Sequence, residues 1–187
     1  MTKEEIIEEI IATNCDPRKH RSRLMKLIES SKNNVRELLE IAFEHDDFLS
    51  FRGGRVLEFV CKQTLVPLIP QLDYFTENIS TVKHHSTRRE VAKICELIAS
   101  EYDSEKSSLI RDGLTNEHKG RIIATCFDWL IGNEKVAIHG YSMQTLFVFG
   151  KESDWIHNEL RQVLVDNMAY GSAGYVSRAK RILKAIA

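Results

Sequence analysis

The sequence has few of the residues that interrupt helices or build flexible linkers. Of its 187 residues only three are proline and nine are glycine, and it contains no Pro-rich or Gly/Ser-rich tract. Flexible linkers and disordered segments are typically made of such tracts. We therefore expect residues 1–187 to form a single domain that is structured over nearly its whole length.

Long apolar runs and paired cysteines are also missing. No stretch approaches the ~20 apolar residues that a membrane-spanning helix needs, and the first residues carry four glutamates instead of the apolar segment of a secretory signal. Zinc and redox sites often use a CxxC pair, but Cys15, Cys61, Cys95 and Cys126 are widely spaced. We expect a cytoplasmic protein that binds no membrane, metal or cofactor.

An excess of one charge is the third absence. The chain has 26 basic and 27 acidic residues, so its net charge is -1. A protein with this balance does not attract nucleic acid or anionic membranes through its overall charge. Any such function requires local clustering of basic side chains.

What the sequence does have is helical periodicity along almost its whole length. Apolar residues recur every three or four positions, which is typical of amphipathic helices. The run most typical of a strand, residues 146–149, ends at Gly150 and is better explained as the end of a buried helix. We expect an all-α fold with helices near residues 3–13, 17–30, 34–44, 50–65, from 67, 86–101, 116–131, 134–150, 153–169 and 171–186.

A weak internal repeat is present among these helices. Superposing every second helix aligns a polar column, while Leu57, Cys95, Tyr141 and Leu183 fall in an apolar column. Equivalent positions that recur every 20–50 residues are typical of arrays of helix pairs. The polar column consists of Arg55, Lys93, His139 and Arg181, at steps of 38, 46 and 42 residues.

The segments KVAIHGYSMQTLFVFGK (135–151) and SAGYVSRAKRILKAI (172–186) carry the repeat most clearly. Over residues 34–186 the chain resembles the HEAT-repeat family and its armadillo-type relatives, which stack pairs of antiparallel helices side by side. The resemblance implies a right-handed α-solenoid of about four to five pairs, with a concave surface formed by the second helices. The expected layout is an N-terminal helical cap (3–30), first repeats (34–101), a polar insertion (102–114) and last repeats (115–187).

The polar column is the best candidate for a binding site. The four second helices are net basic whereas the rest of the chain is net acidic, so a basic groove is expected to bind an acidic peptide, a phosphorylated segment or a nucleic-acid backbone. The alternative is that these side chains cap neighbouring carbonyl groups, or pair with the nearby Glu58, Glu90 and Glu96 as solvated helix-surface ions that contribute little. The candidate partner-binding residues are Arg55, Lys93, His139, Arg181, Arg52, Arg89 and Lys184.

Catalytic motifs are scarce. The Asp128-Trp129 and Asp154-Trp155 dipeptides are similar to the carboxylate and tryptophan pair that HEAT-like DNA glycosylases use, but both tryptophans are most simply explained as core residues. Gly53-Gly54 favours close packing of two helices over a phosphate-binding loop. We expect a monomeric, non-catalytic scaffold that binds a protein partner, with a nucleic-acid binder related to those glycosylases as the alternative.

Overall fold

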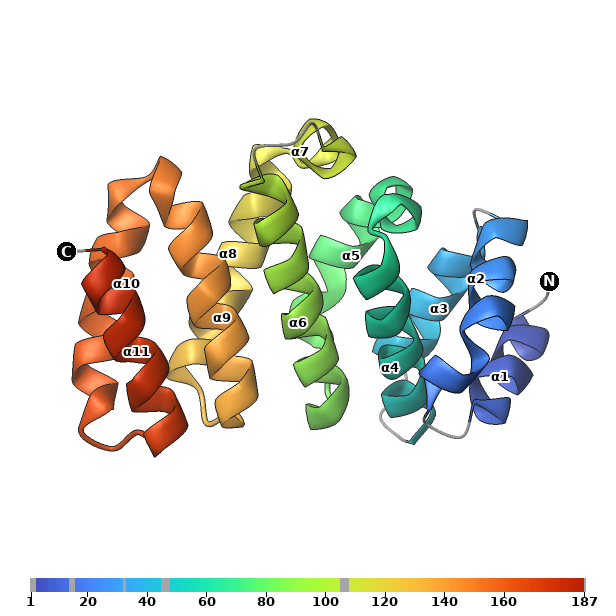
Figure 1. Cartoon of the computed structure of the whole chain (residues 1–187), viewed down its shortest axis with the longest axis horizontal. Coiled ribbons are helices and arrows are strands. Elements are labelled where there is room, and N and C mark those ends of the chain that lie inside the picture. Colours follow the sequence, from blue (N-terminus) through green and yellow to red (C-terminus); the bar gives the residue numbers. More distant parts are fainter. Residues whose placement is uncertain (1–2, 14–15, 32, 45–47, 105–107, 187) are drawn as a thin grey trace.

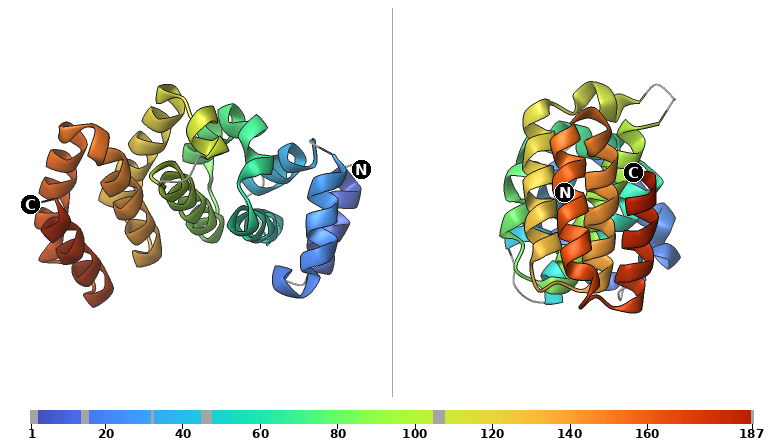
Figure 2. Two further views of the ribbon diagram at one scale, coloured as in Figure 1. Left: turned by 45° about the horizontal axis from the view of Figure 1, so that its top comes forward. Right: turned by 90° about the vertical axis from the view of Figure 1, so that its left-hand side faces the viewer.

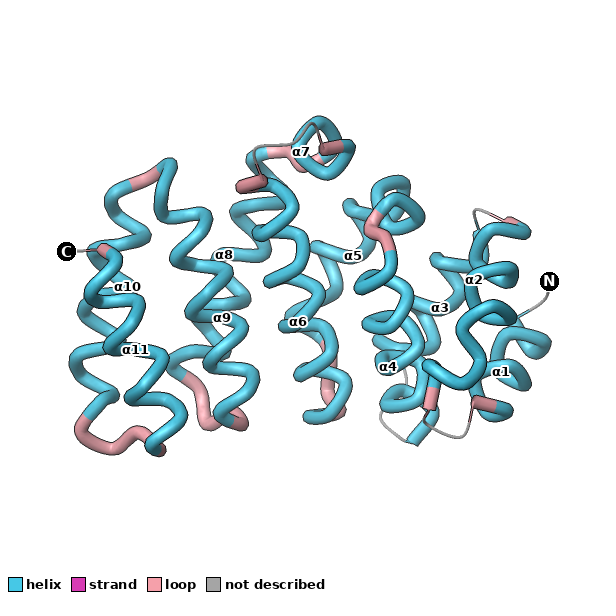
Figure 3. The backbone as a smooth tube through the Cα atoms, viewed as in Figure 1, coloured by secondary structure: helices cyan, strands magenta, loops and turns pink. Residues whose placement is uncertain are grey.

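The computed structural model describes residues 3–13, 16–31, 33–44, 48–104 and 108–186. Within these ranges the backbone forms helices, turns and short connections, with no strand (Figure 3). The expected all-α fold is therefore confirmed for the described residues. The α-helices are α1 (Lys3–Ala12), α2 (Arg21–Ser30), α3 (Asn33–Glu44), α4 (Phe48–Gln63), α5 (Leu72–Asn78), α6 (His85–Tyr102), α7 (Leu109–Gly113), α8 (Asn116–Ile131), α9 (Val136–Phe149), α10 (Asp154–Met168) and α11 (Ala173–Ala185).

Four 3-10 turns complete the described backbone. They are η1 (Pro17–His20), η2 (Val66–Gln71), η3 (Ile79–Thr81) and η4 (Gly150–Glu152). The α-helix expected from Pro67 is wrong in its first turns, because residues 66–71 form η2 and α5 begins only at Leu72. A second proline, Pro70, lies inside η2, where it has no N–H to donate to an α-helical hydrogen bond.

The helices form two layers along the long axis of the molecule. In the inner layer α4 packs against α6, α6 against α9 and α9 against α11. In the outer layer α3 packs behind α4, α5 beside α8, α8 behind α9 and α10 behind α11. The two chain ends lie at opposite ends of this row (Figure 1). The row is bowed, with the inner layer on its concave side (Figure 2).

The hydrophobic core fills the space between the layers. It continues through successive helix pairs, because each inner helix buries apolar residues against its own outer partner and against the next inner helix. Three cysteines of neighbouring helices, Cys61, Cys95 and Cys126, are buried in it. The core includes Leu38, Leu57, Phe75, Ile94, Ile98, Ile122, Leu146, Phe149, Leu160 and Ile182.

Helices α4 and α6 approach each other closely at Gly54. A Cβ atom at Gly54 would lie 2.9 Å from Cγ2 of Thr87 and 3.4 Å from its Cα. One turn earlier on α4, the Ser50 hydroxyl donates a hydrogen bond to the Ala42 carbonyl at 2.7 Å and lies 2.8 Å from the Thr87 hydroxyl. The glycine pair thus marks a close helix contact, as the sequence indicated.

The segments outside the two layers pack at the N-terminal end and at one edge. Helix α1 contacts α3 and α4, and η1 and α2 contact α4. Within the segment 102–114 the described residues include one short helix, α7, which packs against α6 and η2. Over the described ranges, no helix combines the length and the apolar character needed to cross a bilayer.

Candidate binding surface

The outward-facing side of the inner layer carries basic residues that lie one or two turns apart on the same helix. Arg55 and Lys62 belong to this side of α4, and Arg89 and Lys93 to this side of α6. Residues three, four or seven positions apart share one face of a helix. Helix periodicity and the packing of α4 on α6 therefore bring four basic side chains to one surface.

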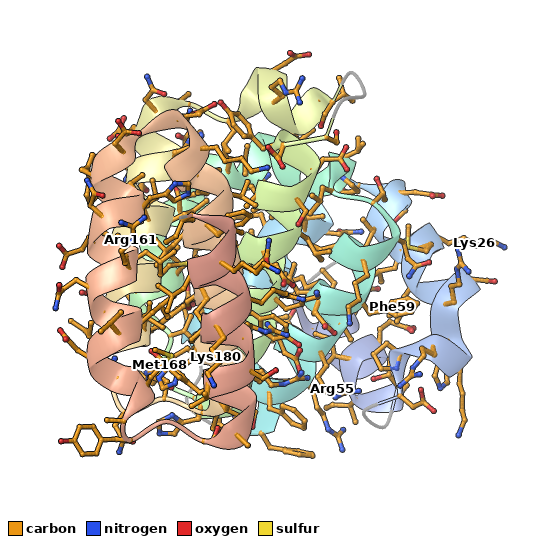
Figure 4. The ribbon with its side chains drawn as sticks, turned by 60° about the vertical axis from the view of Figure 1, so that its left-hand side comes forward. Lys26, Arg55, Phe59, Arg161, Met168 and Lys180 are labelled. Carbon is orange, nitrogen blue, oxygen red and sulfur yellow. The ribbon has the colours of Figure 1, made fainter. Side chains whose placement is uncertain are left out.

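A hollow of about 600 Å³ lies between this surface and the N-terminal helices. Figure 4 shows Arg55 and Phe59 of α4 beside the N-terminal helices, which form the other wall of this hollow, while Lys26 of α2 points away from it. We call this space the basic hollow, because five of its nine lining side chains are cationic. It is lined by Pro17, Arg18 and Arg21 of η1 and α2, by Arg55, Glu58, Phe59, Lys62 and Gln63 of α4, and by Arg89 of α6.

A buried carboxylate lies beneath two of these arginines. Glu90 is fully buried, and its Oε1 accepts a hydrogen bond from Nη2 of Arg89 at 2.6 Å and lies 3.9 Å from Nη1 of Arg55. Burial raises the pKa of Glu90 above its ordinary value, the charge of Glu58 acts in the same direction, and Arg89 and Arg55 oppose the shift. Glu90 therefore holds the two guanidinium groups in place at a desolvation cost.

The ion pairs that the alternative interpretation predicts are present. Lys62 Nζ lies 2.5 Å from Oε1 of Glu58, Arg89 pairs with Glu90, and Lys93 pairs with Glu96. Neutralisation of the basic hollow is nevertheless incomplete. Within the described ranges neither Arg18 nor Arg21 has an ion pair, although both line the hollow.

The structure separates His139 from the other members of the expected column. Its Nε2 lies 3.1 Å from the Gly132 carbonyl oxygen, and its ring meets that of Tyr175 edge-on at 5.5 Å. Lys93 instead points at Tyr141, with Nζ 5.0 Å from the ring centre. Two residues along an α-helix correspond to about 200° of rotation. Placing His139 in one row with Lys93 was therefore wrong, because His139 and Tyr141 point to opposite sides of α9.

The remaining candidates lie at the two ends of the row. Arg181 and Lys184 of α11 are exposed, and no ion pair involves either of them within the described residues. Arg178 reaches the neighbouring helix, because a Cβ atom at Gly140 would lie 2.5 Å from its Nη1. Arg52 turns away towards α1, where Nη1 donates a hydrogen bond to the Ile11 carbonyl at 3.2 Å.

The two Asp-Trp dipeptides do not line the basic hollow. Trp129 is buried in the core, as the sequence indicated, but Trp155 is 56% exposed and stacks on Phe127 at 6.1 Å between ring centres. The expectation that Trp155 is a core residue was wrong. It lies in the first turn of α10, and among the described residues no further layer of helices covers the outer layer.

The chemistry available elsewhere on the described chain is limited. No group of three or more His, Cys, Asp or Glu side chains is arranged to hold a metal ion in the described residues. Burial, with the charge of Glu58, raises the pKa of Cys61 to about 12, so its thiol stays protonated at neutral pH. Cys95 is likewise buried, and Cys15 lies outside the described residues.

The sequence reasoning missed Arg18, Arg21 and Tyr141 as parts of this surface. The signal for the first two is the run PRKHR (17–21), in which four of the five residues are Arg, Lys or His and whose last residue begins α2. Tyr141 falls in the apolar column of the repeat, where its role beside Lys93 has no sequence signature. No protein-family model matches the chain, and the searches of curated proteins and of solved structures also return no match.

Proposed function

We propose that this protein is a non-catalytic binding module that engages an acidic or phosphorylated segment of a partner protein through the basic hollow. The observation that carries the proposal is the convergence of Arg18, Arg21, Arg55 and Arg89 from four helical elements on one hollow of about 600 Å³. Guanidinium groups bind carboxylates and phosphates through two parallel hydrogen bonds, which gives both strength and orientation.

The charge arrangement supports a ligand with more than one negative charge. Glu58 and Glu90 compensate part of the cationic charge of Lys62, Arg55 and Arg89, but Arg18 and Arg21 add uncompensated charge at the opposite wall. A bound anion that bridges the two walls contacts arginines from both sides. Pro17 and Phe59 supply apolar surface for the aliphatic part of such a side chain.

The proposed architecture is a short right-handed solenoid of HEAT-like helix pairs, in which the inner layer is the concave side. The sequential contacts of α4, α6, α9 and α11 support it. In this arrangement an extended partner segment lies along the inner layer, with its acidic residue in the basic hollow and its remainder towards Tyr141 and Arg178. Arg181 and Lys184 then contact the far end of the same segment.

The test is fluorescence anisotropy with three synthetic peptides of one sequence, which carry phosphoserine, glutamate or glutamine at the central position. We expect the phosphoserine peptide to bind best, the glutamate peptide more weakly and the glutamine peptide least. Arg21→Glu should weaken binding of the first two peptides by about tenfold, because it replaces an attractive charge by a repulsive one.

The matched control is Lys26→Glu. Both Arg21 and Lys26 are exposed residues of α2 and undergo the same change of charge, but Lys26 points away from the hollow (Figure 4). It should leave binding nearly unchanged. Equal effects of the two substitutions, or equal binding of all three peptides, would remove the basic hollow as the site.

Nucleic acid is the alternative ligand, and fluorescence anisotropy also distinguishes it from an acidic or phosphorylated peptide. A labelled DNA duplex bound through phosphate contacts should lose affinity steeply as salt increases, and Arg21→Glu should flatten that dependence. The peptide proposal expects little binding of the duplex at physiological salt. Tight duplex binding together with absent phosphopeptide binding would favour the alternative.

A further inference from the structure

A second hollow lies at the edge of the molecule that carries α7. Its volume is about 610 Å³, within the range of sites that hold an organic ligand or several side chains. It is mostly apolar, and its walls come from the end of α2, the start of α3, η2 and α7. We call it the apolar groove; it is lined by Ile28, Glu29, Val35, Val66, Pro67, Ile69, Pro70, Leu109, Asp112 and Gly113.

Large apolar side chains are left in water at this groove. Val66 is 52% exposed and Leu109 is 59% exposed. Both also line an adjoining hollow of about 340 Å³ beside Glu101 and Ser108, so they form a ridge between two depressions. Exposed apolar side chains that stand singly are ordinary, but a contiguous apolar patch with a polar rim marks an interaction site.

The groove has fixed walls. Pro67 and Pro70 restrict the backbone of η2. Gly113 lets α7 approach η2 closely, since a Cβ atom there would lie 3.0 Å from Cγ2 of Ile69. An incoming group therefore meets a surface that is already formed, and little ordering of this chain opposes binding.

The described charged residues that line the groove and the adjoining hollow are all acidic. Glu29 and Asp112 are exposed, and within the described residues neither has an ion pair. Glu101 borders the adjoining hollow and accepts a hydrogen bond from the Ser108 hydroxyl at 2.9 Å. Among the residues that the structure describes, none that lines either hollow is basic. The guanidinium group of nearby Arg111 is held by the Tyr102 carbonyl at 2.8 and 2.9 Å.

We propose that the apolar groove binds an amphipathic helix of a partner protein whose apolar face is flanked by lysine or arginine. A helix presents apolar side chains one turn apart on one face, which matches two depressions separated by the Val66–Leu109 ridge. Basic residues beside that face meet Glu29 and Asp112. The basic hollow binds the opposite charge and shares no lining residue with the groove, and it shares only Gln63 with the adjoining hollow among the described residues.

The experiment uses the full chain and three labelled synthetic helices. The first has leucines along one face and lysines on the others, the second replaces the lysines by glutamates, and the third replaces the leucines by serines. We expect only the first to bind well. Val66→Ser combined with Leu109→Ser should weaken its binding by about tenfold or more, since both side chains lose apolar contact. Glu29→Gln with Asp112→Asn should weaken it about threefold and reduce its dependence on salt.

Ile131→Ser is the control, because Ile131 is 64% exposed but ends α8 and does not line the groove. It should leave binding unchanged. Thermal unfolding of each variant establishes that it is folded. Equal binding of the lysine and glutamate helices, or unchanged binding by the Val66/Leu109 variant, overturns the proposal. A concentration-dependent dimer that this variant abolishes also overturns it, because the groove then holds a second copy of the chain.

Discussion

The ammonium group of Lys93 lies 5.0 Å from the ring centre of Tyr141, which belongs to the next helix of the inner layer. The same ammonium group also pairs with Glu96 one turn along its own helix. An aromatic ring attracts a cation over its face, and the attraction strengthens as water is excluded. The pair thus connects α6 to α9 on the surface that we propose for binding.

We predict a measurable coupling between Lys93 and Tyr141. A double-mutant cycle of Lys93→Met and Tyr141→Leu, measured by urea unfolding, should give a coupling free energy of about 0.5–1 kcal/mol. Tyr141→Phe keeps the ring and should leave the coupling nearly intact. A coupling near zero would mean that the contact does not stabilise the fold.

Adding a methyl group at Gly54, where α4 contacts α6, should destabilise the fold. Gly54→Ala gains helix propensity, but its Cβ would lie 2.9 Å from Thr87 Cγ2 in a packed contact. We expect a net loss of about 1–3 kcal/mol in the free energy of unfolding. Gly120→Ala on α8 is the matched control, because nothing lies within 4 Å of its added Cβ. It should gain about 0.5–1 kcal/mol, and a stabilised Gly54→Ala variant would contradict the packing described here.

Glu152 should stabilise the protein in a pH-dependent way. Its carboxylate accepts hydrogen bonds from Lys119 Nζ at 2.7 Å and from the Tyr102 hydroxyl at 2.6 Å. These two hydrogen bonds lower the pKa of Glu152 below its ordinary 4.5, and burial only partly opposes them. A carboxyl group with a lower pKa in the folded state than in the unfolded state stabilises the fold above its unfolded pKa, and this contribution is lost as pH falls through the folded pKa.

Glu152→Gln should therefore lower the free energy of unfolding at neutral pH by about 1 kcal/mol, a value reduced by the partial exposure of the carboxylate. Chemical unfolding of both proteins over a pH series should show the difference shrinking as the solution becomes acidic below pH 4.5. Glu159→Gln, an exposed change on α10, controls for the loss of charge alone. A difference that is constant over the pH series would point to packing as its cause.

Asn34 joins α2 to α3 through its side chain. It is buried, and its Nδ2 donates to the Leu27 carbonyl at 2.6 Å and to the Ser30 hydroxyl at 3.1 Å. Asn34→Ala removes the donor that satisfies these groups, so we expect a loss of about 1–3 kcal/mol. Asn34→Asp should cost at least as much, because a carboxylate cannot donate to a carbonyl. Thermal unfolding of both variants tests this, and an unchanged midpoint for Asn34→Ala would contradict it.

Much of the fold could be predicted from the sequence because helix periodicity is a local signal. The expected helix at 116–131 has the same ends as α8, and those at 86–101 and 153–169 differ from α6 and α10 by one residue at each end. The η2 segment was missed because its apolar residues suit an α-helix. Pro70 lies inside the segment and has no N–H for an α-helical hydrogen bond, which favours the 3-10 turns instead. Propensity alone does not determine the type of turn that two nearby prolines produce.

The site was predicted only in part, because the direction of a side chain depends on rotation about the helix. Arg89, a candidate outside the column, lines the basic hollow together with Arg55. The column itself places Arg55 of α4 and Lys93 of α6 in one row, and these two helices pack against each other. It failed at α9, where a shift of two residues exchanges His139 for Tyr141. Weak internal repeats tolerate such shifts, because α9 is apolar on nearly all sides and its hydrophobic pattern does not specify a face.

Gly54 directly precedes Arg55, and Thr87 lies two residues before Arg89. The close contact of α4 and α6 therefore also fixes the distance between the backbone positions from which the two arginine side chains extend. That separation is a dimension of the scaffold and not a property of flexible side chains. The hollow should then bind anions of one size better than smaller or larger ones. Ligands that require its walls to move should bind with lower affinity.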